Sequence, residues 1–203
     1  DAITGRLREF GVSSIIVVPA GDGRSFGNDS RVVIQRLTGC GNAYREGFAV
    51  ALADGATHIL MIDADGEADV NTVPAMVLKS MRGADVVVAS RWMRQSEIVG
   101  YRPDKLVLNW AFNKLFGALL RSPVSDHTFT FKLLRREVVE SLPWDAEKQD
   151  IGGQTTMWPV AHGYRVVEVP TTWRARDGKS AGTLSLVGNM RHVVAGLRAL
   201  VMR

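Results

Sequence analysis

The chain has 203 residues, of which 46% are hydrophobic and 23% are charged, a composition typical of a globular domain that excludes a disordered chain. Its net charge of +4 favours an anionic substrate or an anionic membrane surface, but it is too small to argue for nucleic acid. Its single cysteine, Cys40, excludes an intrachain disulfide framework. No apolar run approaches the roughly 18 residues of a membrane span, and the first residues do not resemble a signal peptide. We therefore expect a cytoplasmic protein, with peripheral contact at the cytoplasmic face of a membrane as an open alternative.

Short apolar runs typical of buried strands alternate along the whole chain with stretches that have the periodicity of helices. Strands are expected at 13–18, 31–34, 58–62, 84–89, 128–134 and 165–170. Helices are expected at 4–10, 39–53, 73–82, 106–120, 136–142, 155–161 and 184–202. This alternation predicts an α/β fold with a mainly parallel, doubly wound sheet, and the lack of a repeat or linker predicts a single domain over residues 1–203. The helix at 106–120 is apolar almost all round, which predicts that it packs on two sides.

The strand at 58–62 ends abruptly in Asp63-Ala64-Asp65-Gly66-Glu67. In open α/β sheets, ligands bind at the carboxyl ends of such strands. Alternate side chains of an extended chain point to one side, so the three carboxylates would converge and repel each other without a cation. Hard oxygen ligands suit Mg²⁺ or Mn²⁺, ions that usually also hold substrate phosphates. A solvated Asp/Gly turn is the alternative interpretation.

Two further stretches have features that bind anions. Gly39 and Gly41 open a helix, where free backbone N–H groups can hold a phosphate, although turn chemistry explains the two glycines about as well. The segment from Arg174 to Ser180 carries three cations and a hydroxyl, groups that pair well with phosphate. A solvated basic loop is the alternative interpretation of this segment.

Several short motifs follow one another along the chain. They are Gly39-x-Gly41-x-Ala43-x-Arg45-x-Gly47, Asp63-Ala64-Asp65-x-Glu67, Ser90-Arg91, Lys105 and Asn113, Asp126-x-Thr128-x-x-Phe131-Lys132, Gly163 to Pro170, and Arg176-Asp177-Gly178-Lys179-Ser180. Their order and spacing resemble family 2 glycosyltransferases with the GT-A fold. Within that family, the chain is similar to the polyprenyl-phosphate sugar transferases of the dolichol-phosphate mannose synthase type.

The resemblance implies a metal-dependent, inverting transfer of a sugar from a nucleoside-diphosphate sugar to an acceptor, expected to be a polyprenyl phosphate. It implies that Mg²⁺ or Mn²⁺ is held by Asp63, Asp65 and Glu67. It places donor contacts at Gly41, Arg45, Asp63, Asp65 and Arg91. It places acceptor contacts at Lys105, Arg174, Arg176 and Ser180. The implied catalytic residues are Asp65, which acts through the metal, and Asp126, which would be the base if the acceptor were a hydroxyl. Capping of a turn is an equally good interpretation of Asp126.

The chain departs from the family pattern near its beginning. The family's first strand, which ends in Pro-x-Tyr-Asn-Glu and helps to hold the nucleobase, has no counterpart, and Pro19-Ala20-Gly21-Asp22 replaces the usual Asp-Asp-Gly-Ser. We therefore expect an exposed edge or a gap in the sheet where that strand lies. These departures favour a nucleotide-sugar-binding or inactive module as an alternative function. A sugar nucleotidyltransferase is another alternative, because Gly21-x-Gly23-Arg24-Ser25 faintly resembles its glycine-rich signature.

Overall fold

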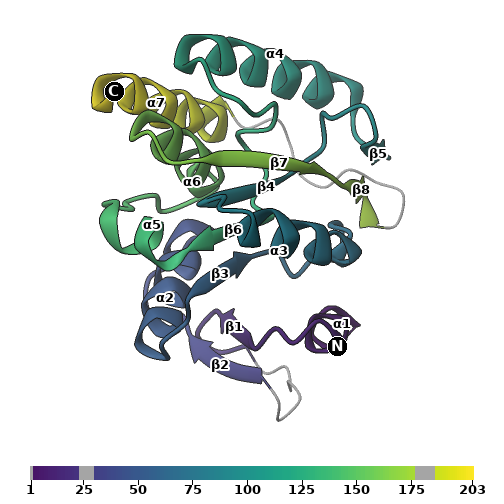
Figure 1. The fold of residues 1–203 in the computed structure, drawn as a ribbon, viewed down its shortest axis with the longest axis vertical. Coiled ribbons are helices and arrows are strands. Elements are labelled where there is room, and N and C mark those ends of the chain that lie inside the picture. Colours follow the sequence, from purple (N-terminus) through teal and green to yellow (C-terminus); the bar gives the residue numbers. More distant parts are fainter. Residues whose placement is uncertain (1, 23–29, 177–185) are drawn as a thin grey trace.

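In the computed structural model, which describes residues 2–22, 30–176 and 186–203, strands and helices alternate as the sequence predicts (Figure 1). The strands are Ser14–Val18 (β1), Ser30–Ile34 (β2), His58–Met61 (β3), Val86–Ser90 (β4), Glu97–Val99 (β5), Lys132–Arg135 (β6), Val166–Pro170 (β7) and Thr172–Arg174 (β8). The helices are Ala2–Glu9 (α1), Cys40–Ala53 (α2), the 3₁₀ turn Val70–Thr72 (η1), Val73–Met81 (α3), Pro103–Leu120 (α4), Arg136–Ser141 (α5), Asp150–Ala161 (α6) and Leu186–Met202 (α7). Every predicted helix and strand is present, with ends that differ by a few residues, whereas the short strands β5 and β8 were not predicted.

The central sheet has four strands in the order β3-β6-β4-β7. β4 pairs parallel with β7, but β6 runs antiparallel to both β3 and β4. The prediction of a mainly parallel sheet is therefore correct for β3, β4 and β7 and wrong for β6. The chain leaves β4 at its carboxyl end, passes through α4 and returns to the same edge, where Thr130 donates a hydrogen bond to Asp63 just beyond β3. A strand that starts at this edge must run opposite to the strands that end there.

β1 and β2 form a separate parallel pair. Within the described residues, neither strand pairs with the four-stranded sheet, although α2 packs against both β1 and β3. Figure 1 shows the pair beyond β3, with α1 beside it. The predicted interruption of the sheet is thus confirmed. In the described part of the chain, β1 and β3 each keep one edge without a strand partner.

The apolar core lies on both faces of the central sheet. Val86 to Ala89 of β4 are completely buried, as expected of a central strand that is apolar on both faces. Residues of α2, α5, α6 and α7 cover one face, and residues of α1 and α3 cover the other. Each fully buried valine contributes about 1.5–3 kcal/mol by removal from water. The carboxyl ends of β3 and β4, where the candidate site lies, therefore stand on a rigid base.

α4 packs on one side only. Its residues Asn113, Phe116 and Leu120 are buried, whereas Val107 and Leu115 are 65% and 56% exposed. The prediction that this helix packs on two sides is therefore wrong, because the described part of the chain supplies no element that covers its outer side. Among the helices of the described residues, none has both the length and the apolar character needed to cross a bilayer.

Candidate active site

The acidic stretch after β3 forms a turn. β3 ends at Met61, and Gly66 adopts a φ of 80°, a left-handed conformation that suits glycine. The extended chain from which three convergent carboxylates were predicted is therefore absent at residues 63–67. Within the described ranges, no three His, Cys, Asp or Glu side chains are arranged as a ready-made metal site. The three carboxylates have to be considered one by one.

Asp63 is held between two hydroxyl groups from different elements. The Tyr44 hydroxyl of α2 donates to Oδ1 of Asp63 at 2.6 Å, and the Thr130 hydroxyl donates to Oδ2. Tyr44 is partly buried, and desolvation of its hydroxyl together with the Asp63 charge raises the tyrosine pKa well above its ordinary value. The tyrosine is therefore a permanent hydrogen-bond donor. These two bonds fix the orientation of the Asp63 carboxylate relative to α2 and the segment before β6.

Asp65 and Glu67 are less constrained. Oδ1 of Asp65 accepts a hydrogen bond from the Glu67 backbone N–H at 3.0 Å, and Oε1 of Glu67 accepts one from the Arg176 backbone N–H at 3.3 Å. Each carboxylate keeps its second oxygen without a hydrogen bond from the described residues. Partial burial, followed by the charges of Asp65 and Asp63, raises the pKa of Glu67 against the opposing effect of Arg176. Two close carboxylates, each with one oxygen that accepts no hydrogen bond from the described residues, fit Mg²⁺ or Mn²⁺. These ions take their other ligands from water and phosphate.

Strand β8 is joined to this turn by backbone hydrogen bonds. The Asp69 N–H donates to the Thr172 carbonyl at 3.2 Å, and the Arg174 N–H donates to the Glu67 carbonyl at 2.9 Å. Ala68 and Trp173 form an isolated antiparallel bridge between the two segments. The carboxylate turn and the beginning of the basic segment are therefore one structural unit, a contact that the sequence did not predict.

The predicted acceptor residues lie around β8. The exposed guanidinium of Arg174 lies 3.8 Å from a carboxylate oxygen of Glu97 on β5. The backbone N–H of Arg176 donates to Glu67, so Arg176 lies beside the carboxylate turn. Lys105 lies in the first turns of α4, close after Tyr101, whose ring packs on Trp173 of β8 with centroids 4.8 Å apart. Ser180 lies outside the described residues.

Asp126 and Arg91 form a buried ion pair. Arg91 Nε donates to Asp126 Oδ2 at 2.8 Å and Nη2 donates to Oδ1 at 3.0 Å, while the backbone N–H groups of Thr128 and Phe129 donate to Oδ1. Asp126 is completely buried and Arg91 is 8% exposed. Burial raises the pKa of Asp126, but the Arg91 charge and hydrogen bonds outweigh it and hold the pKa below its ordinary value. This geometry favours the alternative interpretation of Asp126, which is capping of a turn. The roles of Asp126 as a general base and of Arg91 as a donor contact remain predictions.

The glycine-rich start of α2 packs against backbone. The N–H groups of Gly41 and Asn42 donate to the Glu147 carbonyl at 3.1 and 3.3 Å. A Cβ atom on Gly41 would lie 2.5 Å from the Ala146 carbonyl oxygen, so only glycine fits there. Close packing therefore explains Gly41, and the amides of Gly41 and Asn42 already have a carbonyl acceptor. The donor contact at Gly41 remains a prediction. Arg45, one turn further, donates to the Asn42 side chain at 3.1 Å and is partly buried.

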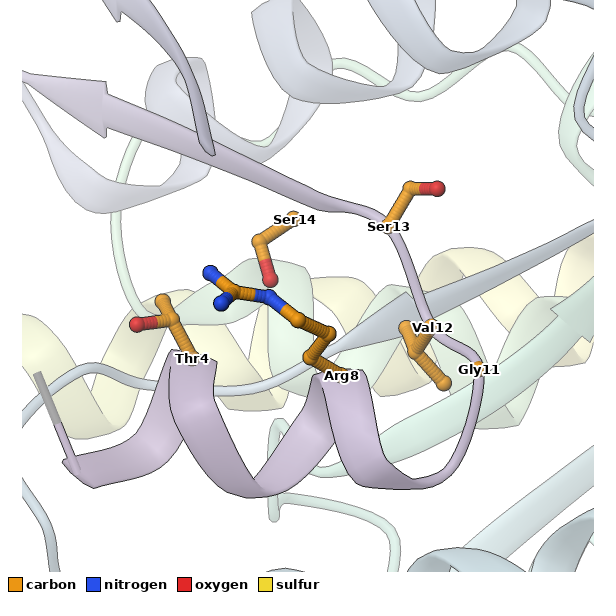
Figure 2. A pocket seen from close by; sticks show the side chains of 6 residues that line it. All are labelled: Thr4, Arg8, Gly11, Val12, Ser13 and Ser14. Carbon is orange, nitrogen blue, oxygen red and sulfur yellow. The ribbon is translucent and has the colours of Figure 1, made fainter. Parts of the chain in front are cut away.

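Two surface pockets lie away from the carboxylate turn. One of about 250 Å³ lies between α1 and the beginning of β1, where Arg8 reaches from the helix toward Ser14 (Figure 2). The other, of about 400 Å³, lies beside α4 and is lined by Trp92, Trp110 and Lys114. Neither pocket is lined by a predicted site residue. The candidate site is therefore the turn at 63–67 with β8, and the sequence missed its two supporting hydroxyls because Tyr44 and Thr130 are distant in sequence from Asp63.

Residues 24–142 match the family described as Glycosyl transferase family 2. An undecaprenyl-phosphate mannosyltransferase of Micrococcus luteus is 30% identical over 200 residues, which cover 91% of this chain and 82% of that protein. A polyprenol monophosphomannose synthase of Mycolicibacterium smegmatis is 29% identical over 144 residues, 68% of this chain and 54% of that protein. The chain belongs to glycosyl transferase family 2 and is a glycosyltransferase.

Solved structures support the same fold. Glucosyl-3-phosphoglycerate synthase from Mycobacterium tuberculosis, in complex with phosphoglyceric acid, superposes with a TM-score of 0.63 at 16% identity, over 99% of this chain and 85% of that chain. The same enzyme in complex with Mn²⁺, uridine diphosphate and phosphoglyceric acid gives a TM-score of 0.61 at 17% identity. At this identity the likeness defines the GT-A fold. It confirms the fold class predicted from the sequence.

Proposed function

We propose that this chain transfers a hexose from a nucleoside-diphosphate sugar to a polyprenyl phosphate, with inversion at the anomeric carbon and with Mg²⁺ or Mn²⁺ held by Asp65 and Glu67. The observation that carries the proposal is the turn at 63–67, where two carboxylates with oxygens to spare are joined to the cation-bearing strand β8. The names of the relatives support the acceptor class. Mn²⁺ and uridine diphosphate in the fold neighbour support the metal and the donor class.

The residues around the turn take distinct roles in this proposal. When bound, the metal would neutralise the charge that develops on the leaving diphosphate. Asp63, oriented by Tyr44 and Thr130, would accept a hydrogen bond from a donor hydroxyl group. Arg176 would place its positive charge beside the diphosphate, because its backbone is already bound to Glu67. These roles all belong to one end of the site.

Acceptor binding would use the cations beyond the turn. Arg174 on β8 and Lys105 at the beginning of α4 would face the phosphate, together with Ser180. A phosphate oxygen is already anionic at neutral pH and needs little help from a general base. The burial of Asp126 in an ion pair is consistent with an acceptor of this kind. A hydroxyl acceptor would need a base that is free to take its proton.

A nucleotide-sugar-binding module without transferase activity is the second candidate. The interruption between β1 and β3 favours it, because this part of the sheet is expected to hold the nucleobase in the family. The two candidates make the same prediction for donor binding and opposite predictions for transfer. The nucleotidyltransferase alternative depends on Gly21 to Ser25, most of which lies outside the described residues.

The test uses two measurements on the same protein. Thermal unfolding is followed with a panel of nucleoside-diphosphate sugars, with and without Mn²⁺, and transfer of radiolabelled sugar to a polyprenyl phosphate is then measured with the donor that stabilises most. We expect stabilisation that needs metal and is lost with EDTA, followed by transfer. Stabilisation without transfer to any acceptor would favour the binding module. Transfer that persists in chelator would refute the metal.

A further inference from the structure

Exposed apolar side chains gather on two neighbouring helices. More than half of the large hydrophobic residues that are exposed in the described part of the chain belong to α4 and α7. On α4 they are Val107, Leu108, Trp110, Leu115 and Leu119, and on α7 they are Met190, Val194, Leu197 and Val201. Scattered exposed hydrophobic residues are normal, but a contiguous group marks an interaction surface.

The exposed residues of α7 form one stripe, and α4 packs beside this helix. On α7 they recur at intervals of four, three and four residues, the spacing of a single helical stripe. Phe112 of α4 packs on His192 of α7 with ring centroids 6.0 Å apart. A Cβ atom on Gly196 would lie 2.2 Å from the Phe116 ring, so the helices approach closely at a glycine. Figure 1 shows α4 and α7 together at one end of the molecule, so we call this group of side chains the α4–α7 face.

The cations of these two helices fall into two groups. Arg191 and Arg198 of α7 lie within ion-pair distance of acidic side chains of residues 145–150. α7 contains no acidic residue, and α4 contains only Asp104, in its first turn. Lys114, Arg121 and Arg203 are exposed, and none of them forms an ion pair with an acidic side chain of the described residues. Arg203 lies near the end of α4, where it donates to the Leu119 carbonyl at 3.5 Å. Cations without an acidic partner, next to exposed apolar side chains, match an anionic lipid surface.

Trp110 strengthens this assignment. It is 49% exposed on α4 and lies beside Lys114 in the lining of the same pocket. Tryptophan is enriched where a protein meets the boundary between lipid headgroups and acyl chains, because its ring is apolar and its N–H is polar. Apolar stripes, a tryptophan and surrounding cations are the features of helices that lie in the plane of a membrane interface.

We propose that the α4–α7 face docks this chain on the surface of an anionic lipid bilayer. The purpose of this docking, which is to bring a membrane-embedded polyprenyl phosphate to the site, rests on the proposed function. The docking itself does not. The position of the face suits that purpose, because α4 begins just after Tyr101, which packs on Trp173 of β8 beside the carboxylate turn. Docking through this face would hold the acceptor end of the site close to the bilayer.

The test measures flotation with vesicles that contain no polyprenyl phosphate and no nucleotide sugar. Vesicles of phosphatidylcholine are compared with vesicles that also contain phosphatidylglycerol. We expect binding that depends on phosphatidylglycerol and weakens as salt rises. The double variant L115E/L197E, which changes exposed positions, should bind at least about tenfold more weakly. The matched control L78E/M81E removes two exposed apolar residues from α3 and should bind like the unmodified chain.

Several outcomes would overturn the proposal. Absence of binding to anionic vesicles would do so, as would an equal loss of binding in the α3 control. A dimer detected by light scattering that L115E/L197E dissociates would assign the face to a second copy of the chain. Transfer to a short-chain, water-soluble acceptor separates this result from the proposed function, because L115E/L197E should retain it. Vesicle binding without any transfer would leave the docking face intact while the proposed function failed.

Discussion

Two groups of carboxylates stand at the same edge of the central sheet in opposite environments. Asp126 is completely buried, and both its oxygens are taken by Arg91 and by backbone N–H groups. Asp65 and Glu67 are partly exposed, and each keeps an oxygen without a partner in the described chain. A carboxylate whose oxygens accept hydrogen bonds from fixed donors stabilises the fold and is a weaker base than a free one. The comparison teaches that position at a functional edge does not define a role, whereas uncommitted lone pairs do.

The largest expected effect is on stability, from replacement of Asp126. Asp126→Ala should lower the free energy of unfolding by about 3–5 kcal/mol, because it leaves the Arg91 guanidinium buried without its partner. Urea denaturation measures this change. The double variant R91M/D126L, which removes both charges, should recover much of the loss. A D126A variant that is as stable as the unmodified chain but inactive would restore Asp126 as a candidate base.

Replacement of Asp65 should reduce transfer while leaving the stability of the chain almost unchanged. Asp65→Asn should reduce transfer by a factor of about 10²–10³, the scale of one lost electrostatic contact in a transition state, about 3 kcal/mol. Its free energy of unfolding should change little, since Asp65 has only a local hydrogen bond to the Glu67 backbone. Metal-dependent donor binding by calorimetry provides the direct measurement. The control Glu140→Gln removes an exposed carboxylate of α5 and should leave both activity and donor binding unchanged.

Removal of the Tyr44 hydroxyl should have a smaller effect. Tyr44→Phe takes away one of the two hydrogen bonds that orient Asp63, and hydrogen bonds to charged groups contribute about 1.5–3 kcal/mol. We expect weaker donor affinity and a modest loss of stability, with Thr130→Val acting in the same direction. The control Tyr164→Phe removes an exposed hydroxyl that pairs with Ser141 and should behave like the unmodified chain. Unchanged donor affinity in both Y44F and T130V would show that the orientation of Asp63 is irrelevant to the donor.

The sequence predicted the local features of the site but not its long-range pairs. An apolar run that stops at a group of acids is a local pattern, so β3 and the acidic stretch after it were found. The turn at 63–67 was only the alternative to the extended chain that was predicted there. The partner of Asp126 lies 35 residues away and that of Asp63 lies 19 residues away, on other elements. Only the fold brings such pairs together, and one sequence contains no signal for them. Asp126 was therefore predicted to be a base on its position alone.

The sequence also predicted the local features of the fold better than the relations between distant segments. Hydrophobic periodicity identified β6 as a strand, but the direction of a strand depends on the path of the connection before it. β5 and β8 have only three residues each, which is too short for a periodic pattern. The interruption beside β1 was predicted because it follows from a motif that the chain lacks. Patterns within one element therefore located the longer strands and helices, whereas the direction of β6 and the packing of α4 depended on other elements.

The smallest expected effect is a displacement in pH dependence, and it sharpens the contrast between the two groups of carboxylates. The pKa of Glu67 is raised by partial burial and by its acidic neighbours, whereas that of Asp126 is lowered. The metal binds the deprotonated carboxylate, so protons compete with it. Metal-dependent donor binding should therefore begin to weaken, as pH falls, at a higher pH than an ordinary glutamate would give. Glu67→Gln should bind donor and metal more weakly and lose this part of the pH dependence.

In the unliganded chain, a raised carboxyl pKa costs stability once the group ionises, so E67Q should be slightly more stable than the unmodified chain at neutral pH. Donor affinity is measured over a pH series, and stability is measured on the same samples. The two measurements test the expected weakening of donor binding at low pH and the expected gain in stability of E67Q. Identical pH profiles for E67Q and the unmodified chain would remove Glu67 from the metal site and leave Asp65 to hold the cation with the donor phosphates.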